Sequence, residues 1–241
     1  MKRALLSSVA LALALIAVAI TVLAQPSPAP ASPAQAGARV RFVHASPDVS
    51  AVDVLLDGST VFTNVAFSRW TEYMEVATGT YTVSARLTSE GTPVLTDTVM
   101  MTDTDYTLTA AGTKAAGGKP LELITFLDDN SAPPGGMARG RFVHLVPDAP
   151  PVDIALEGEI LFESVGYGDA TDYVAVPSGS HTLQIQTPLG EITATATAGP
   201  NDVYSFFAVG RVFGSPALDI VQTLDETYNH PIWLPLVTKE D

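Results

Sequence analysis

Hydrophobic and polar residues alternate one by one over most of the chain beyond residue 37. Val52, Val54 and Leu56 share one face of an extended segment, and Asp53 and Asp57 share the other. A period of two is typical of β-strands that bury one face. Asp57 is followed by Gly58, a pair that favours a tight hairpin turn. The pattern predicts strands near residues 39–44, 51–56, 60–66, 71–77, 80–87, 93–99, 105–111 and 121–127, and it predicts no helix.

The same pattern then occurs a second time. Ala38–His44 recurs as Ala138–His144, and 19 of the 45 positions from 38 to 82 are identical at an offset of 100 residues. The offset falls to 98 at Tyr204–Gly210 and to 97 at Leu218–Val221, as loop deletions between strands produce. A unit of this length is a domain and not a solenoid repeat. We expect an all-β protein with two tandem antiparallel β-sandwich domains, Ig-like or transthyretin-like.

Both ends of the chain, and the segment between the copies, differ from the repeats. Lys2 and Arg3 precede an uncharged apolar run from Ala4 to Leu23. This arrangement predicts either a signal peptide cleaved after Ala24 or a retained membrane anchor. The predicted organisation is a signal peptide or anchor at 1–24, a Pro/Ala-rich linker at 25–37, repeat 1 at 38–127, a linker at 128–137, repeat 2 at 138–226 and a tail at 227–241 whose apolar part is Ile232–Val237.

Charge and cysteine content narrow the function classes. Removal of the first 24 residues leaves 26 acidic residues against 10 basic ones. Such an excess of negative charge opposes binding to nucleic acid or to anionic lipid. We therefore expect membrane contact only through an uncleaved N-terminal segment. The chain has no cysteine, so disulfides, thiolate metal sites and a lipid-modified cysteine are excluded.

The repeat resembles a known family. Arg39 to Asp48 reads Arg-Val-Arg-Phe-Val-His-Ala-Ser-Pro-Asp, and Ala-Val-Asp-Val, Asp-Gly, Thr-Glu-Tyr and Thr-Gly-Thr-Tyr-Thr-Val follow it. These segments resemble the bacterial domain of unknown function 4397, whose members are typically exported and often carry the domain in tandem. Repeat 2 departs from the opening motif at Gly140, Leu145, Val146 and Pro151. The resemblance implies an architecture and no activity.

His44, Asp48 and Asp53 form the most suggestive group, and repeat 2 keeps it as His144, Asp148 and Asp153. A histidine with two carboxylates could bind a metal or act as a general base. However, His44 shares a strand face with Val40 and Phe42, which favours a hydrogen-bonded core histidine. Asp48 follows a proline in a turn, where its side chain can accept backbone N–H groups.

Other candidate motifs favour structural roles. His181 aligns with Tyr81, which indicates packing. Asp103–Asp105 and Asp128–Asn130 have calcium-like spacing but lack the glycine and terminal glutamate of a calcium loop, so we interpret them as solvated turn residues. Gly112–Lys119 resembles a phosphate loop, but a strand follows it where a helix is required, so we predict a hairpin loop. Ser68-Arg69-Trp70, which aligns with Gly168-Asp169-Ala170, is a candidate contact for sugars or protein partners.

The sequence therefore favours a non-catalytic protein of the cell surface, envelope or exterior, with a structural or adhesive role. Its expected partner is an extracellular protein or glycan. We predict no catalytic residues, no metal site and no cofactor. Two alternatives stay open: a calcium- or glycan-binding surface protein, and a hydrolase with a carboxylate-based site.

Overall fold

The computed structural model describes residues 37–115 and 118–228, and all regular secondary structure in them is β-strand. Both repeats belong to a single unit of contacting strands. Repeat 1 contains β1 (Gly37–His44), β2 (Val52–Leu56), β3 (Ser59–Val65), β4 (Met74–Ala77), β5 (Gly79–Leu87), β6 (Pro93–Met101), β7 (Asp105–Ala111) and β8 (Glu122–Asp128). Repeat 2 contains β9 (Met137–His144), β10 (Val152–Leu156), β11 (Glu159–Val165), β12 (Val174–Pro177), β13 (Gly179–Thr187), β14 (Gly190–Ala198), β15 (Asp202–Val209) and β16 (Asp219–Thr227).

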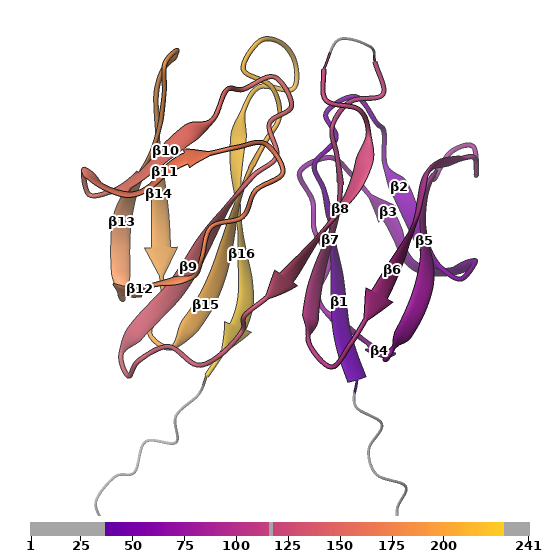
Figure 1. Cartoon of the computed structure of the whole chain (residues 1–241), viewed down its shortest axis with the longest axis horizontal. Coiled ribbons are helices and arrows are strands. Elements are labelled where there is room, and N and C mark those ends of the chain that lie inside the picture. Colours follow the sequence, from indigo (N-terminus) through magenta and orange to yellow (C-terminus); the bar gives the residue numbers. More distant parts are fainter. Residues whose placement is uncertain (1–36, 116–117, 229–241) are drawn as a thin grey trace, which may run out of the picture. The chain divides into compact units, whose positions relative to one another are not determined.

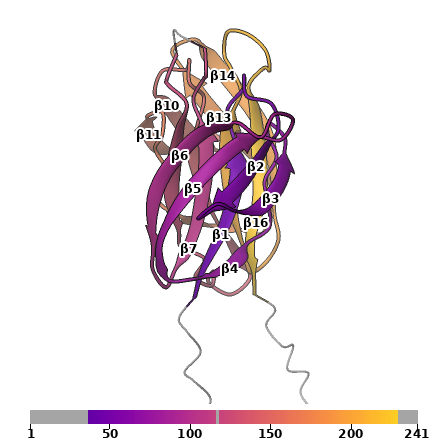
Figure 2. The same ribbon diagram turned by 90° about the vertical axis from the view of Figure 1, so that its right-hand side faces the viewer.

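Each repeat is a sandwich of two four-stranded sheets (Figure 1), which confirms the predicted fold class. In repeat 1 the sheets have the orders β4-β1-β7-β8 and β3-β2-β5-β6, and repeat 2 has the equivalent orders β12-β9-β15-β16 and β11-β10-β13-β14. Figure 2 looks onto the β3-β2-β5-β6 sheet. One pair in each repeat, β1 with β7 and β9 with β15, is parallel, and the other pairs are antiparallel. An immunoglobulin sandwich keeps its first two strands in one sheet, so the order found here leaves the transthyretin-like alternative.

The predicted hairpin at Asp57-Gly58 is present. Both residues have positive φ angles, 48° and 79°, as a tight two-residue turn between twisted strands requires. Repeat 2 makes the same turn with Glu157 and Gly158, whose φ angles are 51° and 85°. The turn fixes the register of β2 and β3, and with it the face that carries Val52, Val54 and Leu56.

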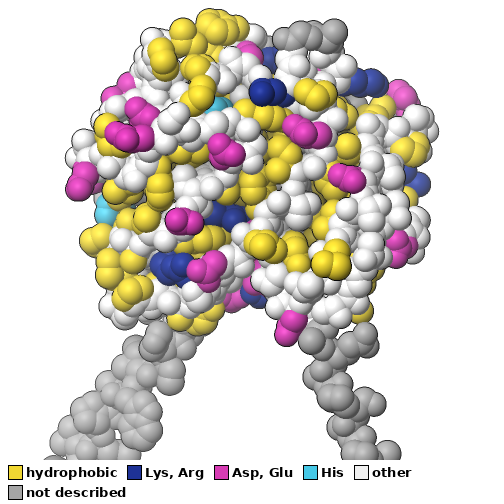
Figure 3. Space-filling model, in the orientation of Figure 1, with side chains coloured by type: hydrophobic (Ala, Val, Ile, Leu, Met, Phe, Trp, Pro, Cys, Tyr) yellow, Lys and Arg dark blue, Asp and Glu magenta, His cyan; other side chains and the backbone are white. Residues whose placement is uncertain are grey.

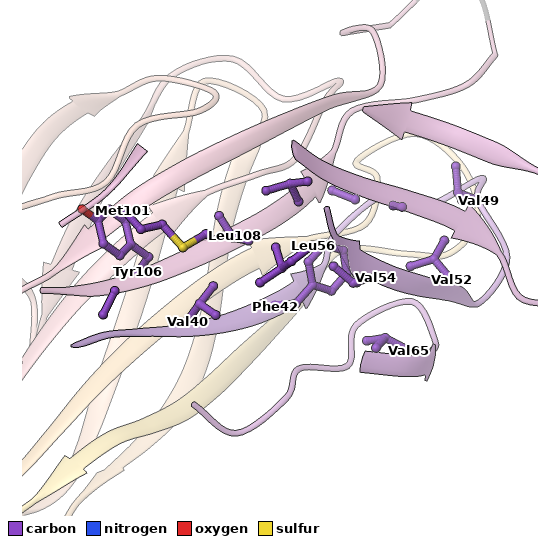
Figure 4. Packing of buried hydrophobic residues seen from close by; sticks show 14 of the residues in the cluster. Val40, Phe42, Val49, Val52, Val54, Leu56, Val65, Met101, Tyr106 and Leu108 are labelled. Atoms are coloured by element: carbon purple, nitrogen blue, oxygen red, sulfur yellow. The ribbon is translucent and has the colours of Figure 1, made fainter. Parts of the chain in front are cut away.

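Each sandwich has its own apolar core between its two sheets. In repeat 1 the core includes Phe42, Val54, Met101 and Leu108, which Figure 4 shows packed between facing strands. In repeat 2 it includes Phe142 and neighbouring residues of β10, β13 and β14. The inward face of each strand is the hydrophobic face predicted from the alternation.

A third apolar cluster joins the repeats. It is formed by residues on the opposite faces of the β1 and β9 sheets, turned away from the two sandwich cores. It contains Val43, Ala45, Ala111, Phe126, Val143, Leu145, Phe207, Val209 and Val221, with Phe67, Ile124 and Tyr167 packed against it. These sheets therefore bury both of their faces, whereas the sequence pattern predicted only one buried face per strand.

The predicted signal peptide or anchor at 1–24, nearly all of the linker at 25–37 and all but the first residues of the tail lie outside the described residues. Within the described ranges, no helix has the length and apolar character needed to cross a membrane.

Candidate functional site

In the structure, the side chains of His44, Asp48 and Asp53 each form hydrogen bonds with different backbone groups. His44 is buried, its Nε2–H donates to the carbonyl of Ser50 at 3.1 Å, and its Nδ1 accepts the N–H of Ser46 at 3.3 Å. Burial disfavours the charged ring and lowers the pKa of His44. His144 repeats this geometry and this pKa shift. This is the hydrogen-bonded core histidine that the sequence favoured.

Asp48 anchors the loop between β7 and β8. Its two carboxylate oxygens accept the N–H groups of Lys114 and Ala115, each at 2.9 Å. Burial would raise the pKa of Asp48, but these two backbone donors, together with the nearby Arg211 guanidinium, outweigh burial and lower the pKa. Asp148 holds the corresponding loop of repeat 2 through Val212 and its neighbour.

Asp53 stabilises an irregularity in the β2–β3 hairpin. It accepts the N–H of Asn64 at 3.0 Å and the hydroxyl of Thr88 at 2.7 Å, and both hydrogen bonds lower its pKa. Asn64 has a positive φ of 54°, and the register between the strands shifts beside Val54. Asp153 accepts the N–H of Ser164 in the same way. A carboxylate at this point holds a bulge in place.

His181 also has a backbone partner. Its Nε2 donates to the carbonyl of Pro177 at 2.7 Å, and the hydroxyl of Tyr81 donates to the equivalent Ala77 carbonyl at 2.8 Å. The two different side chains thus make the same contact in the two repeats, in agreement with a packing role.

The prediction of solvated turn residues was wrong at Asp105, Asp128 and Asn130, whereas Asp103 and Asp129 are exposed. The Asp128 side chain is 0% exposed, and Asp105 accepts two hydrogen bonds from Arg39, at 2.8 and 2.5 Å. Asn130 is buried and donates to Asp105 at 2.8 Å. The sequence reasoning treated these residues as turns because it examined their spacing and not the arginines that the other strands place opposite them.

Those arginines belong to a buried ionic cluster between the repeats. Arg41 of β1 donates to Asp225 of β16 at 2.6 Å, and Arg141 of β9 donates to Asp128 of β8. Two arginines face two aspartates, so the cluster is neutral. The two ion pairs are reciprocal: each repeat supplies one arginine and one aspartate at equivalent positions. We call this set, Arg41, Arg141, Asp128 and Asp225, the ionic cluster.

Tyrosines and hydroxyl groups complete the ionic cluster. Tyr73 donates to Asp128 at 2.5 Å, and burial, together with the nearby carboxylates, raises the pKa of this phenol. Tyr173 has a raised pKa for the same reasons and lies under the Arg141 guanidinium, 4.9 Å from its ring centre. Buried charges persist only where such partners satisfy them.

The signal for this site was present in the sequence. Arg41 and Arg141 are kept in both copies on the strand face opposite the core, and Asp128 and Asp225 are kept at the end of the last strand. A retained arginine on a face predicted to meet solvent is the clue that this face is covered.

A groove of about 680 Å³ runs beside the ionic cluster. One wall is Ile124–Leu127 of β8, and the other is the Gly168–Tyr173 loop of repeat 2, with Arg141 between them. In Figure 3, basic side chains lie recessed between hydrophobic and acidic ones on the face where the repeats meet. We call this feature the inter-repeat groove.

The β8 wall presents a free strand edge, because β8 is the last strand of its sheet. Arg141 of repeat 2 donates to the Leu127 carbonyl at 2.8 Å, so this carbonyl points away from β7. In an antiparallel strand alternate residues point the same way, so Thr125 also directs its N–H and C=O outward. The groove is therefore lined by backbone donors and acceptors as well as by apolar side chains.

The groove carries net negative charge. Arg141 and Arg139 line it, but they are paired with Asp128 and Asp129. Asp169 and Asp172, which also line it, add two further carboxylates. A partner with a basic group fits this balance.

Trp70 lies in the repeat 1 loop that corresponds to the second wall of the groove. The residue is partly exposed, at 38%, and its backbone forms an isolated bridge with Val43, as that of Ala170 does with Val143. The exposure leaves Trp70 available as a contact residue. No group of three or more histidine and carboxylate side chains arranged to hold a metal ion occurs among residues 37–115 and 118–228.

The strand order and the ionic cluster define an all-β tandem-repeat protein whose two sandwiches pack through equivalent sheets. A family model described as a domain of unknown function, DUF4397, matches residues 38–155 and again 141–231. The chain belongs to this family, and the two matches confirm the tandem copies. No curated protein sequence matches it.

Solved structures that match the chain include two proteins from Bacteroides. One is a "putative cell adhesion protein" from Bacteroides ovatus ATCC 8483, with a TM-score of 0.24 and 8% identity over 80% of this chain and 98% of that chain. The other, given the same description, is from Bacteroides eggerthii DSM 20697, with a TM-score of 0.22 and 8% identity over 80% of this chain and 96% of that chain.

Proposed function

We propose that the chain is a non-catalytic protein, exported or held at the cell envelope, that binds an extracellular protein through the inter-repeat groove. The observation that carries the proposal is the free edge of β8 on one wall of that groove. A free edge pairs with an extended peptide through main-chain hydrogen bonds, and neighbouring pockets then select its side chains.

The chemistry of the groove defines the expected partner. Thr125 offers an outward-facing N–H and C=O, Ile124 and Tyr173 supply apolar contacts on the two walls, and Asp172 favours a positive charge. The partner is therefore an extended segment with a basic residue among apolar ones. Of the two partner classes expected from the sequence, this geometry favours a protein over a glycan.

Screening of the full chain against a peptide library and a glycan array tests the proposal. We expect peptides with a Lys or Arg beside apolar residues to bind, and binding to weaken at high salt. Ala170→Trp introduces into the groove wall the residue that repeat 1 carries at the equivalent position. This variant should fold and lose at least tenfold in affinity.

Trp70→Ala is the matched control, because it changes the equivalent loop on the other side of the interface and should leave groove binding unchanged. Binding only to glycans, or peptide binding that Ala170→Trp leaves intact, would contradict the proposal. Protease digestion of intact cells tests the expected location, since an exported or surface-held chain is cleaved without lysis.

A further inference from the structure

A small apolar cavity lies between the two sheets of repeat 2. Its volume is about 50 Å³, and its walls include Phe142, Ile154, Phe162, Leu183 and Phe206. Leu161, a residue that is 38% exposed, borders the cavity. The cavity belongs to the sandwich core of one repeat and is separate from the inter-repeat groove.

Repeat 1 is filled at the same place. Gly79 pairs with Met101 and Gly179 pairs with Ala198, so Met101 and Ala198 are equivalent. Met101 is 1% exposed, and Figure 4 shows it beside Tyr106 and Val40 in the repeat 1 core.

At two further positions, repeat 2 also has a smaller residue than repeat 1. Register makes Val99 equivalent to Ala196, and the repeat offset makes Val40 equivalent to Gly140. Repeat 2 thus has the smaller residue at three positions around one end of its core. Phe206 recovers part of the lost packing, since its ring lies 3.2 Å from where a Cβ of Gly140 would stand.

The polar groups near the cavity are already engaged. His181 donates to the Pro177 carbonyl at 2.7 Å, and the Tyr204 hydroxyl accepts the Gly199 N–H at 3.0 Å and donates to Asp202 at 2.8 Å. A buried water needs two or more polar partners, and apolar cavities without them stay dry and take apolar guests. A molecule that binds in this cavity is therefore expected to be apolar.

The volume of the cavity limits which apolar molecules can bind in it. Engineered cavities of about 150 Å³ hold an aromatic ring, and this cavity is about a third of that volume. A linear alkyl chain is slender enough to enter end-on. We propose that repeat 2 binds the end of a linear alkyl chain between its sheets, past Leu161, and that repeat 1 does not.

Methyl NMR of the full chain tests the proposal, with n-octanol as the probe. We expect saturable shifts in the methyl groups of Ile154 and Leu183 and none in those of Val54 and Val83, the equivalent positions of repeat 1. Cyclohexanol, a bulky ring with the same hydroxyl group, should give no saturable shift. A second arm with phosphatidylcholine vesicles distinguishes a free alkyl ligand from a membrane-embedded chain.

Two variants exchange the properties of the repeats. Ala198→Met fills the cavity and should weaken octanol binding at least tenfold, while Met101→Ala should create saturable shifts at Val54 and Val83. If Ala198→Met fails to fold, Ala196→Val fills less of the same space and serves instead. Octanol shifts that persist in a folded filling variant, equal shifts in both repeats, or no saturable shift at all would overturn the proposal. These outcomes do not depend on peptide binding in the inter-repeat groove.

Discussion

Replacement of Arg41 by methionine tests whether the ionic cluster holds the two repeats together. The Arg41 side chain is almost completely buried and donates to Asp225 at 2.6 Å and to Thr107 at 2.8 Å. Methionine is similar in length and carries no charge. The substitution therefore leaves the Asp225 carboxylate buried without its cation.

The size of the expected stability loss depends on which groups around the ionic cluster keep their hydrogen-bond partners after the substitution. Thr107 still donates to Asp128 at 2.6 Å, and Ser205 still donates to Asp225 at 2.5 Å, so the hydroxyl groups stay satisfied. The cost falls on the uncompensated charge, and loss of one member of a buried pair costs about 3–5 kcal/mol. For a chain of this size, that loss lowers the melting temperature by about 6–20 °C.

Denaturant and thermal unfolding of the full chain measure this loss. Glu226→Gln is the control, because Glu226 pairs with Arg39 at 2.7 Å while both side chains are about one third exposed, and Arg39 keeps its two hydrogen bonds to Asp105. Such a pair contributes about 0.2–1 kcal/mol. The double variant Arg41→Met with Asp225→Asn should recover at least about 1 kcal/mol of the loss, since the two residues interact directly. Equal losses for Arg41→Met and Glu226→Gln would refute the reasoning.

Three further outcomes are expected. Asp48→Ala should free the Lys114 and Ala115 N–H groups, lower stability by about 1 kcal/mol and speed amide exchange in that loop. Asp53→Ala should lower the melting temperature, whereas the exposed Asp97→Ala should not. Because burial lowers the pKa of His44, the unfolded chain binds more protons below its own histidine pKa of about 6.5. Stability should therefore be constant above that pH and fall as pH drops toward the folded pKa, more steeply in the wild type than in His44→Gln.

The strands and the duplication could be predicted because each is recorded locally. The alternation around Val54 gives the strand and its buried face, Asp57-Gly58 gives the turn, and the recurrence of Arg39 to His44 gives the second domain. No local sequence pattern indicates the order of the strands within the sheets. The pairing of β1 with β7 joins residues about 66 positions apart, and nothing in the local pattern distinguishes that pairing from an immunoglobulin arrangement.

The candidate site was predicted less well for the same reason. The roles of His44 and Asp48 depend on nearby backbone groups, so turn chemistry was enough to interpret them. The ionic cluster joins Arg41 to Asp225, 184 residues away and in another domain. The inter-repeat groove depends on that interface, so it could not be placed before the interface was known.

The interface also shows why the repeats are not interchangeable. Arg41 lies 5.9 Å from the ring centre of Phe207, and Arg141 lies 5.8 Å from that of Phe126. Register makes Phe207 equivalent to Thr109, and the repeat offset makes Phe126 equivalent to Thr223, so each repeat supplies one phenylalanine from a different strand.

The charged residues of the interface are thus symmetric while its aromatic residues are complementary, which fixes a single pairing of the two sheets. The shape of the inter-repeat groove depends on this pairing, because the two walls of the groove come from different repeats. Arg141 connects the two properties directly: one of its nitrogen atoms neutralises Asp128, and another donates to the Leu127 carbonyl on the groove wall. Any change that loosens the ionic cluster must therefore also alter the strand edge that we propose as the binding surface.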